Sequence, residues 1–201
     1  MKTPWLWLFG LLFLVASPVE ADIKILVLGD SLTAGYGLPL EQAFPAQLET
    51  ALCQRGHSVQ VVNAGISGDT SAGGAARLAW SLSDRPDIVI IELGANDALR
   101  GLSPQQTEAN LAAIIEQVEQ ENMIALLTGM KAPRNLGATY YNSFDGLYPA
   151  LAQQFDVAFY PFFLDGVAGV PELNQSDGIH PSPKGVKVIV EGILPLVESL
   201  L

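Results

Sequence analysis

A serine, an aspartate and a histidine stand out in this sequence because together they could carry out nucleophilic chemistry. Ser31 lies in the turn Gly29-Asp30-Ser31-Leu32, directly after an apolar run. Asp177 precedes His180 by three residues in a turn near the C-terminus. At this spacing one turn can hold both side chains on the same side, so that the carboxylate accepts from one ring nitrogen while the other faces a serine.

Two further loops offer hydrogen-bond donors to an anion. Gly65 follows a second apolar run, and a glycine allows close approach to its backbone N–H. Asn96 follows a third run and carries a side-chain amide. Each of these motifs alone is more typical of an ordinary turn or cap than of a functional site. Their occurrence together in one chain favours an active site.

The elements that must position these residues follow a repeating pattern. Short apolar runs alternate with helical stretches, which is typical of a parallel sheet covered on both faces. We expect strands at residues 23–28, 59–62, 88–93, 124–127 and 157–160, and helices at 41–54, 71–81, 104–121, 140–154 and 183–200. Ser103 and Ser182, each followed by proline, are expected to cap their helices, with Gln106 completing a capping box at the first. The predicted fold is α/β, a three-layer α/β/α (flavodoxin-like) sandwich with a central parallel sheet of about five strands.

The loops after these strands are the place to expect a site, because ligands bind beyond the carboxyl ends of the strands in such sheets. Ser31, Gly65, Asn96, Asp177 and His180 all fall in such loops. The other histidine of the chain, His57, precedes its strand and is therefore expected at the opposite edge, as a surface residue. The sequence thus predicts one site at the carboxyl edge of the sheet.

Composition excludes several classes of protein. The chain has 201 residues, 49% of them hydrophobic, and a formal net charge of −11. This apolar content is too high for a disordered chain, and the acidic balance gives no basic surface for nucleic acid. A single cysteine excludes an internal disulfide framework and a cysteine-rich metal centre.

The first residues are typical of an export signal. Lys2 supplies a positive start, an apolar segment follows, and small residues surround a cleavage point near Ala21 and Asp22. About twelve apolar residues would span about 18 Å as a helix, which is short of the roughly 30 Å hydrocarbon core, although an uncleaved anchor stays open. We expect a cleavable signal peptide at residues 1–21 and one domain at 22–201. The mature form is expected to be a monomer, periplasmic or secreted, without stable membrane insertion.

Four sequence blocks carry a resemblance to a known family. In order and spacing, the chain resembles the SGNH/GDSL hydrolase superfamily, and is most similar to its exported bacterial branch of multifunctional thioesterases, lysophospholipases and arylesterases. The blocks are Gly29-Asp30-Ser31-Leu32, Gly65, Gly94-Ala95-Asn96-Asp97 and Asp177-Gly178-Ile179-His180-Pro181. The GxSxG motif of ordinary α/β-hydrolases is absent around Ser31, so that neighbouring family does not fit.

The resemblance implies a role for each residue. Ser31 would attack the acyl carbonyl, His180 would act as base and then acid, and Asp177 would fix the histidine tautomer. The oxyanion would be held by the backbone N–H groups of Ser31 and Gly65 and by the Asn96 amide. This chemistry needs no metal and no cofactor.

The resemblance also implies a substrate class, namely fatty acyl esters and thioesters, including lysophospholipids and aryl esters. Candidate acyl-binding residues are Leu32, Leu99, Leu136 and Tyr140, although core packing explains each of them equally well. Two alternatives stay open. A carbohydrate O-acetylesterase would use the same machinery, and a non-catalytic periplasmic binding module would merely keep the fold.

The remaining polar residues suggest structural roles. Asp30, Asp69 and Asp97 are candidates for a carboxylate metal site, but we expect them to brace their loops by accepting from nearby backbone donors. Cys53 is expected to be a small buried residue within a helix. Glu92 ends an apolar run and is expected to be buried, with a partner that the sequence does not reveal.

Overall fold

The computed structural model describes residues 23–201 and contains a five-stranded sheet of parallel strands in the order β2-β1-β3-β4-β5. Continuous apolar runs form these strands because both faces of the sheet are covered. The strands are β1 (Ile23–Gly29), β2 (Val59–Gly65), β3 (Ile88–Glu92), β4 (Ile124–Thr128) and β5 (Ala158–Tyr160). The predicted signal peptide at residues 1–21 lies outside the described residues.

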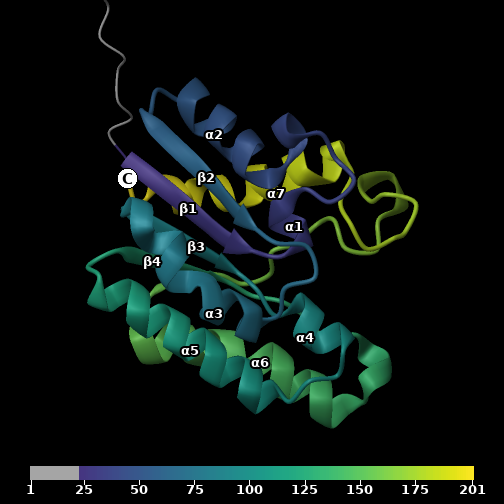
Figure 1. The fold of residues 1–201 in the computed structure, drawn as a ribbon. Coiled ribbons are helices and arrows are strands. Elements are labelled where there is room, and N and C mark those ends of the chain that lie inside the picture. Colours follow the sequence, from purple (N-terminus) through teal and green to yellow (C-terminus); the bar gives the residue numbers. More distant parts are fainter. Residues whose placement is uncertain (1–22) are drawn as a thin grey trace, which may run out of the picture.

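Helices cover the sheet on both faces (Figure 1). One layer holds α2 (Phe44–Gln54) and α7 (Pro183–Glu198), which pack against each other. The other layer holds α3 (Ser71–Ser81), α5 (Pro104–Gln120) and α6 (Ala138–Phe155). The structure thus confirms the expected α/β sandwich. No helix within residues 23–201 is both long enough and apolar enough to span a bilayer.

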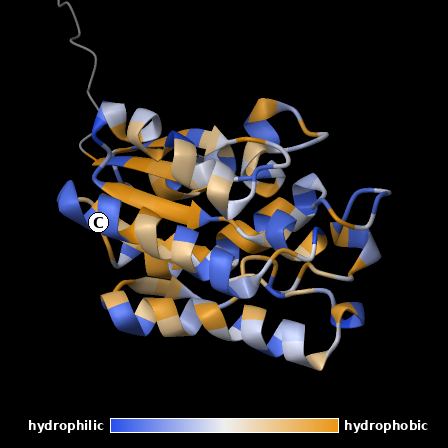
Figure 2. Ribbon diagram, turned by 60° about the horizontal axis from the view of Figure 1, so that its bottom comes forward, coloured by the Kyte–Doolittle hydropathy of each residue, from blue (hydrophilic) through white to orange (hydrophobic). Residues whose placement is uncertain are grey.

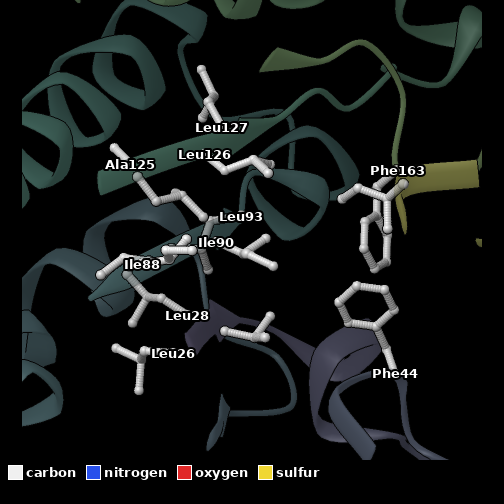
Figure 3. Packing of buried hydrophobic residues seen from close by; sticks show 14 of the residues in the cluster. Leu26, Leu28, Phe44, Ile88, Ile90, Leu93, Ala125, Leu126, Leu127 and Phe163 are labelled. Carbon is white, nitrogen blue, oxygen red and sulfur yellow. The ribbon is translucent and has the colours of Figure 1, made fainter. Parts of the chain in front are cut away.

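The core consists of aliphatic side chains from the strands and from the inward faces of the helices. In Figure 2 the strands are hydrophobic along their length, whereas the helices alternate between hydrophobic and hydrophilic residues. Aromatic rings extend this core toward the carboxyl edge. Phe44, at the start of α2, meets Phe163 edge to face with 5.0 Å between ring centroids (Figure 3). This contact joins the helix after β1 to the loop after β5.

The strand order reverses between β1 and β3, and this places a crevice beyond their carboxyl ends. Two short helices begin there, α1 (Ser31–Ala34) after β1 and α4 (Ala95–Leu99) after β3. The sequence pattern did not predict either helix, because one turn of helix is too short to show a period. Each of them carries one of the predicted site residues, Ser31 or Asn96.

Two other local predictions are wrong. Ser103 occupies the expected N-cap position of α5, but its hydroxyl accepts no capping bond and instead donates to the Gln105 side chain, and the Gln106 amide donates to Asn110 instead of completing a capping box. Ser182 caps α7 as expected by accepting from the Gly185 N–H. Cys53 is exposed rather than buried. It lies on α2 next to the buried Leu52, so the helical register turns it toward solvent.

Candidate active site

Three predicted residues form one hydrogen-bonded chain at the carboxyl edge of the sheet. Ser31 is the first residue of α1, and its Oγ lies 2.9 Å from Nε2 of His180. The opposite ring nitrogen, Nδ1, lies 2.7 Å from Oδ2 of Asp177. In the tautomer that suits both contacts, Nδ1–H donates to the carboxylate and Nε2 accepts from the Ser31 hydroxyl. This tautomer leaves Nε2 free to remove the serine proton.

Asp177 is held in its ionised form by the turn that carries it. Its Oδ1 accepts from the backbone N–H groups of Ile179, at 2.9 Å, and His180, at 3.0 Å. The hydrogen bond from the His180 side chain, followed by the two backbone bonds, lowers the pKa of Asp177 to about 2. The carboxylate therefore stays charged beside the imidazole throughout the neutral range.

The loop carrying His180 is tied to the loop that follows α1. The Gln175 side-chain amide donates to the carbonyl oxygens of Tyr36, at 2.7 Å, and Pro181, at 3.0 Å. The Gln175 backbone N–H donates to the His180 carbonyl at 2.7 Å, and the Tyr36 ring lies over the imidazole with 4.5 Å between centroids. Because Tyr36 and Ser31 belong to the same segment, these contacts hold the imidazole close to the serine.

The predicted oxyanion donors come from the carboxyl ends of three adjacent strands, since Ser31 follows β1, Gly65 ends β2 and Asn96 lies in α4 after β3. The Gly65 N–H already donates to Oδ1 of Asn63 at 3.0 Å, so an oxyanion would share this N–H or displace the Asn63 oxygen. One N–H of the Asn96 amide donates to Oδ2 of Asp30 at 2.9 Å, which leaves the second for an incoming anion. A Cβ at Gly65 would lie 2.3 Å from the Ala34 nitrogen, so only glycine fits this position.

Beneath the serine lies a buried pair of acids. Asp30 caps α1 by accepting from the Leu32 N–H at 3.0 Å, and burial raises its pKa to about 6 although this bond and the Asn96 amide lower it. Glu92 is fully buried and accepts from the Thr33 hydroxyl, at 2.7 Å, and the Asp30 N–H, at 3.2 Å. Burial, and then the Asp30 charge, raise the pKa of Glu92 well above its ordinary value. The folded protein therefore keeps a proton on this pair above the pH at which free carboxyls lose theirs.

This retained proton predicts a pH dependence of stability. An acid whose folded pKa is raised stabilises the fold below its unfolded pKa, and that contribution is lost as pH rises through the folded pKa. We therefore expect the free energy of unfolding to fall between about pH 4 and pH 7, and to fall less in Glu92→Gln. Urea unfolding at several pH values measures both slopes. Glu191→Gln, on the exposed face of α7, is the matched control, and parallel curves for wild type and Glu92→Gln would contradict the assignment.

The other two loop aspartates brace loops, as expected. Asp69 pairs with Arg77 at 2.6 Å, and the Arg77 guanidinium also donates to the Gly29 carbonyl at 2.9 Å. Buried Asp97 accepts from the Ser71 N–H at 2.8 Å and from the Thr107 hydroxyl at 3.2 Å. Within residues 23–201 no three histidine, cysteine, aspartate or glutamate side chains gather as metal ligands would.

A cavity of about 310 Å³ opens beside the serine and histidine. Besides Ser31, Asn96 and His180, its lining includes apolar side chains from four loops: Leu32, Leu99, Met130, Pro133, Phe162 and Leu164. Of the four expected acyl-binding residues, Leu32 and Leu99 line this cavity.

Leu136 and Tyr140 lie outside the lining of this cavity. The Tyr140 hydroxyl donates to the Leu102 carbonyl at 2.7 Å, and its ring stacks on Phe144 with 6.1 Å between centroids. Leu136 lies in the short helix Arg134–Leu136 and is 37% exposed. Neither side chain therefore belongs to the apolar lining of the cavity beside the serine.

Comparison of the sequence with known protein families shows the family of this chain. Residues 27–188 match the model of the GDSL-like lipase/acylhydrolase family. The chain belongs to this family. Like other GDSL-like lipase/acylhydrolases, it is an enzyme.

Several GDSL-like relatives resemble the chain over nearly their whole length. Esterase TesA of Pseudomonas aeruginosa is 43% identical over 198 residues, which cover 98% of each chain. The thioesterase 1/protease 1/lysophospholipase L1 of Escherichia coli K12 is 41% identical, over 97% of this chain and 94% of that protein. A crystal structure of TesA superposes with a TM-score of 0.84 at 44% identity, covering 89% of this chain and 99% of that one.

Proposed function

We propose that the protein hydrolyses carboxylic esters and thioesters through an acyl-enzyme on Ser31. The observation that carries this proposal is the hydrogen-bonded chain from Ser31 through His180 to Asp177, beside an apolar cavity. The names of its relatives, an esterase and a thioesterase/lysophospholipase, support the same reaction class.

The geometry supports a two-step mechanism. Ser31 Oγ attacks the acyl carbonyl while His180 Nε2 takes the hydroxyl proton, and Asp177 stabilises the resulting imidazolium. The tetrahedral intermediate collapses when His180 protonates the departing alcohol or thiol, which leaves the acyl group on Ser31. Water then attacks the acyl-enzyme with His180 again as base, and the fatty acid is released.

The oxyanion of both tetrahedral intermediates would be bound by the Ser31 and Gly65 N–H groups and the free N–H of Asn96. Because the second Asn96 N–H is held by Asp30, the amide is already oriented before substrate arrives. Loss of one such preorganised donor typically costs about 10²–10³-fold in rate. Asp30 therefore acts on the reaction by orienting the Asn96 amide.

The acyl chain would lie in the cavity beside Ser31. With Leu32 and Leu99 in its lining, this cavity favours fatty acyl groups, as in lysophospholipids and long-chain aryl esters, over small acetyl groups. Burial of each methylene is worth about 0.8 kcal/mol, or about fourfold in kcat/KM, until the cavity is filled.

Acyl-chain length gives the test of this substrate class. With p-nitrophenyl esters from acetyl to palmitoyl, we expect kcat/KM to rise from acetyl toward octanoyl. Leu99→Ser should reduce the octanoyl value several-fold more than the acetyl value, because Leu99 lines the cavity. Leu136→Ser, which changes a leucine outside the lining, is the control. A maximum at acetyl would favour a carbohydrate O-acetylesterase instead.

We also propose that the protein acts outside the cytoplasm as a monomeric domain of residues 22–201. The support is the charged start, apolar segment and small residues of positions 1–21. Mass spectrometry of protein recovered from the periplasm or medium of a bacterial host should give an N-terminus at Asp22. Recovery only in the membrane fraction, with Met1 or Lys2 still present, would contradict cleavage.

A further inference from the structure

The exposed large hydrophobic side chains of this protein are unevenly distributed. Residues 23–201 hold nine of them, and seven lie in loops between the carboxyl end of a strand and the next long helix. We call these seven the active-site rim: Tyr36, Leu40, Ile66, Leu99, Leu102, Leu136 and Ile179. The other two, Trp80 and Ile124, lie at the last turn of α3 and the first residue of β4, which is the opposite edge of the sheet.

The rim is continuous with the candidate active site. Leu99 and Ile179 belong both to the rim and to the lining of the cavity beside Ser31. The remaining members come from the loops that follow β1, β2, β3 and β4, at the same edge of the sheet as the cavity. In Figure 1 these loops lie together at the end of the molecule opposite the C-terminus. Exposed apolar side chains gathered on one face mark a binding surface.

We propose that the active-site rim docks on the surface of aggregated zwitterionic lipid, so that acyl substrate passes from the aggregate directly into the cavity. This inference rests on the proposed function, since it assigns the source of the substrate for the same site. A long-chain lysolipid is held in micelles or bilayers by the hydrophobic effect. An apolar rim beside the cavity reduces the contact of the acyl chain with water while the lipid moves from the aggregate into the cavity.

Charge selects the kind of lipid surface. The chain carries a formal net charge of −11, which an anionic bilayer repels. The loops of the rim carry both signs, with Arg100, Lys131 and Arg134 opposed by Asp165, Glu172 and Asp177, so that the described residues form no basic patch around the cavity. Docking must therefore depend on apolar contact rather than on counter-charges, and a zwitterionic surface permits that contact. We expect weak binding to anionic vesicles at low salt.

A second copy of the chain is a poorer occupant of the rim. The cavity opens within the rim, so a dimer formed through it would cover Ser31 and close the route for substrate. A lipid aggregate covers the same side chains while it supplies the substrate. The two occupants also differ in their effect on activity, because dimer formation would lower it as protein concentration rises.

The test compares rim variants with a control from the opposite edge. Leu40, which is 78% exposed, and Leu102 lie outside the cavity lining, so Leu40→Asp and Leu102→Asp remove rim surface without changing the cavity. Trp80→Asp is the matched control, because Trp80 is 79% exposed and far from the rim. The exported protein is used after its N-terminus has been determined, so that no uncleaved apolar segment contributes to binding.

Docking is measured by co-sedimentation of each protein, in a Ser31→Ala background, with phosphatidylcholine vesicles. Passage of substrate from the aggregate into the cavity is measured by hydrolysis of micellar lysophosphatidylcholine. We expect each rim variant to lose about 10-fold or more in both, and Trp80→Asp to lose little. Hydrolysis of water-soluble p-nitrophenyl acetate should stay near wild type in all three, which also reports that they are folded.

The outcomes separate the two proposals. Docking would be overturned if the protein hydrolysed p-nitrophenyl acetate but did not bind vesicles. It would also be overturned if Trp80→Asp lost as much vesicle binding and lysophosphatidylcholine hydrolysis as the rim variants. Either result would leave the hydrolase assignment intact. A concentration-dependent dimer that rim variants abolish would assign the rim to a second copy and overturn docking as well. Absence of activity on both substrates would instead contradict the proposed function.

Discussion

Ser31→Ala should lower kcat for p-nitrophenyl octanoate by about 10⁴-fold or more, because the substitution removes the hydroxyl proposed to form the acyl-enzyme. The Ser31 side chain is half-buried and its hydrogen-bond partner is Nε2 of His180, so its loss should leave the thermal midpoint of unfolding nearly unchanged. Steady-state kinetics and circular dichroism on the same sample separate the loss of chemistry from the loss of fold.

Ser176→Ala provides the matched control for this experiment. Ser176 is exposed and lies in the same loop as Asp177 and His180, but its hydroxyl takes no part in the chain of hydrogen bonds. Its activity should equal that of the wild type. If Ser31→Ala kept more than a small fraction of wild-type activity, the nucleophile would have to be another group. If the wild type and Ser31→Ala were both folded and both inactive on the ester, a non-catalytic binding module would be favoured instead.

Asp177→Asn should lower kcat by about 10⁴-fold, by imposing the wrong histidine tautomer. Two backbone N–H groups donate to Oδ1 of Asp177, so the asparagine oxygen is expected to keep that position. The new NH₂ group then faces Nδ1 of His180 and forces this nitrogen to accept. The proton moves to Nε2, which can no longer take the proton of Ser31.

Asp165→Asn, at an exposed position of the same loop, controls for the loss of a negative charge and should have little effect. The pH profile gives an independent reading of Asp177→Asn. A tautomer defect should recover partly at alkaline pH, where hydroxide replaces the histidine as base, whereas a structural defect should not. A loss of less than about 10-fold would mean that Asp177 does not fix the imidazole, in contrast to the triad pattern.

The fold was predictable because its signals are local and repeated. Five apolar runs and five helical stretches define the parallel sheet and its layers, and the observed strand ends differ from the expected ones by a few residues. The short helices α1 and α4 were missed, since a single turn shows no periodicity. The face on which Cys53 lies also depends on the exact register of α2 against its neighbours, which a pattern of apolar residues defines only coarsely.

The sequence predicts that Ser31, Asn96 and His180 lie close together because each of them follows a strand at the same edge of the sheet. What the sequence did not reveal are the contacts between distant segments. One such contact is the hydrogen bond from the Gln175 side chain, in the loop that carries His180, to the Tyr36 carbonyl. Another is the pairing of Glu92 with the Asp30 N–H and the Thr33 hydroxyl, which lie about sixty residues earlier in the chain. Such pairings depend on tertiary packing and leave no pattern of spacing. For the same reason Leu136 could not be separated from Leu99 as a cavity residue.

If the proposed mechanism holds, Ser31 carries the acyl group during turnover. The direct measurement is to quench the reaction with p-nitrophenyl octanoate in acid within the first turnover, digest the protein and locate the octanoyl group by peptide mass spectrometry. We predict an octanoyl ester on the peptide containing Ser31, and none in Ser31→Ala. Acylation of a different residue, or a pre-steady-state burst of product without any acylated peptide, would contradict the mechanism.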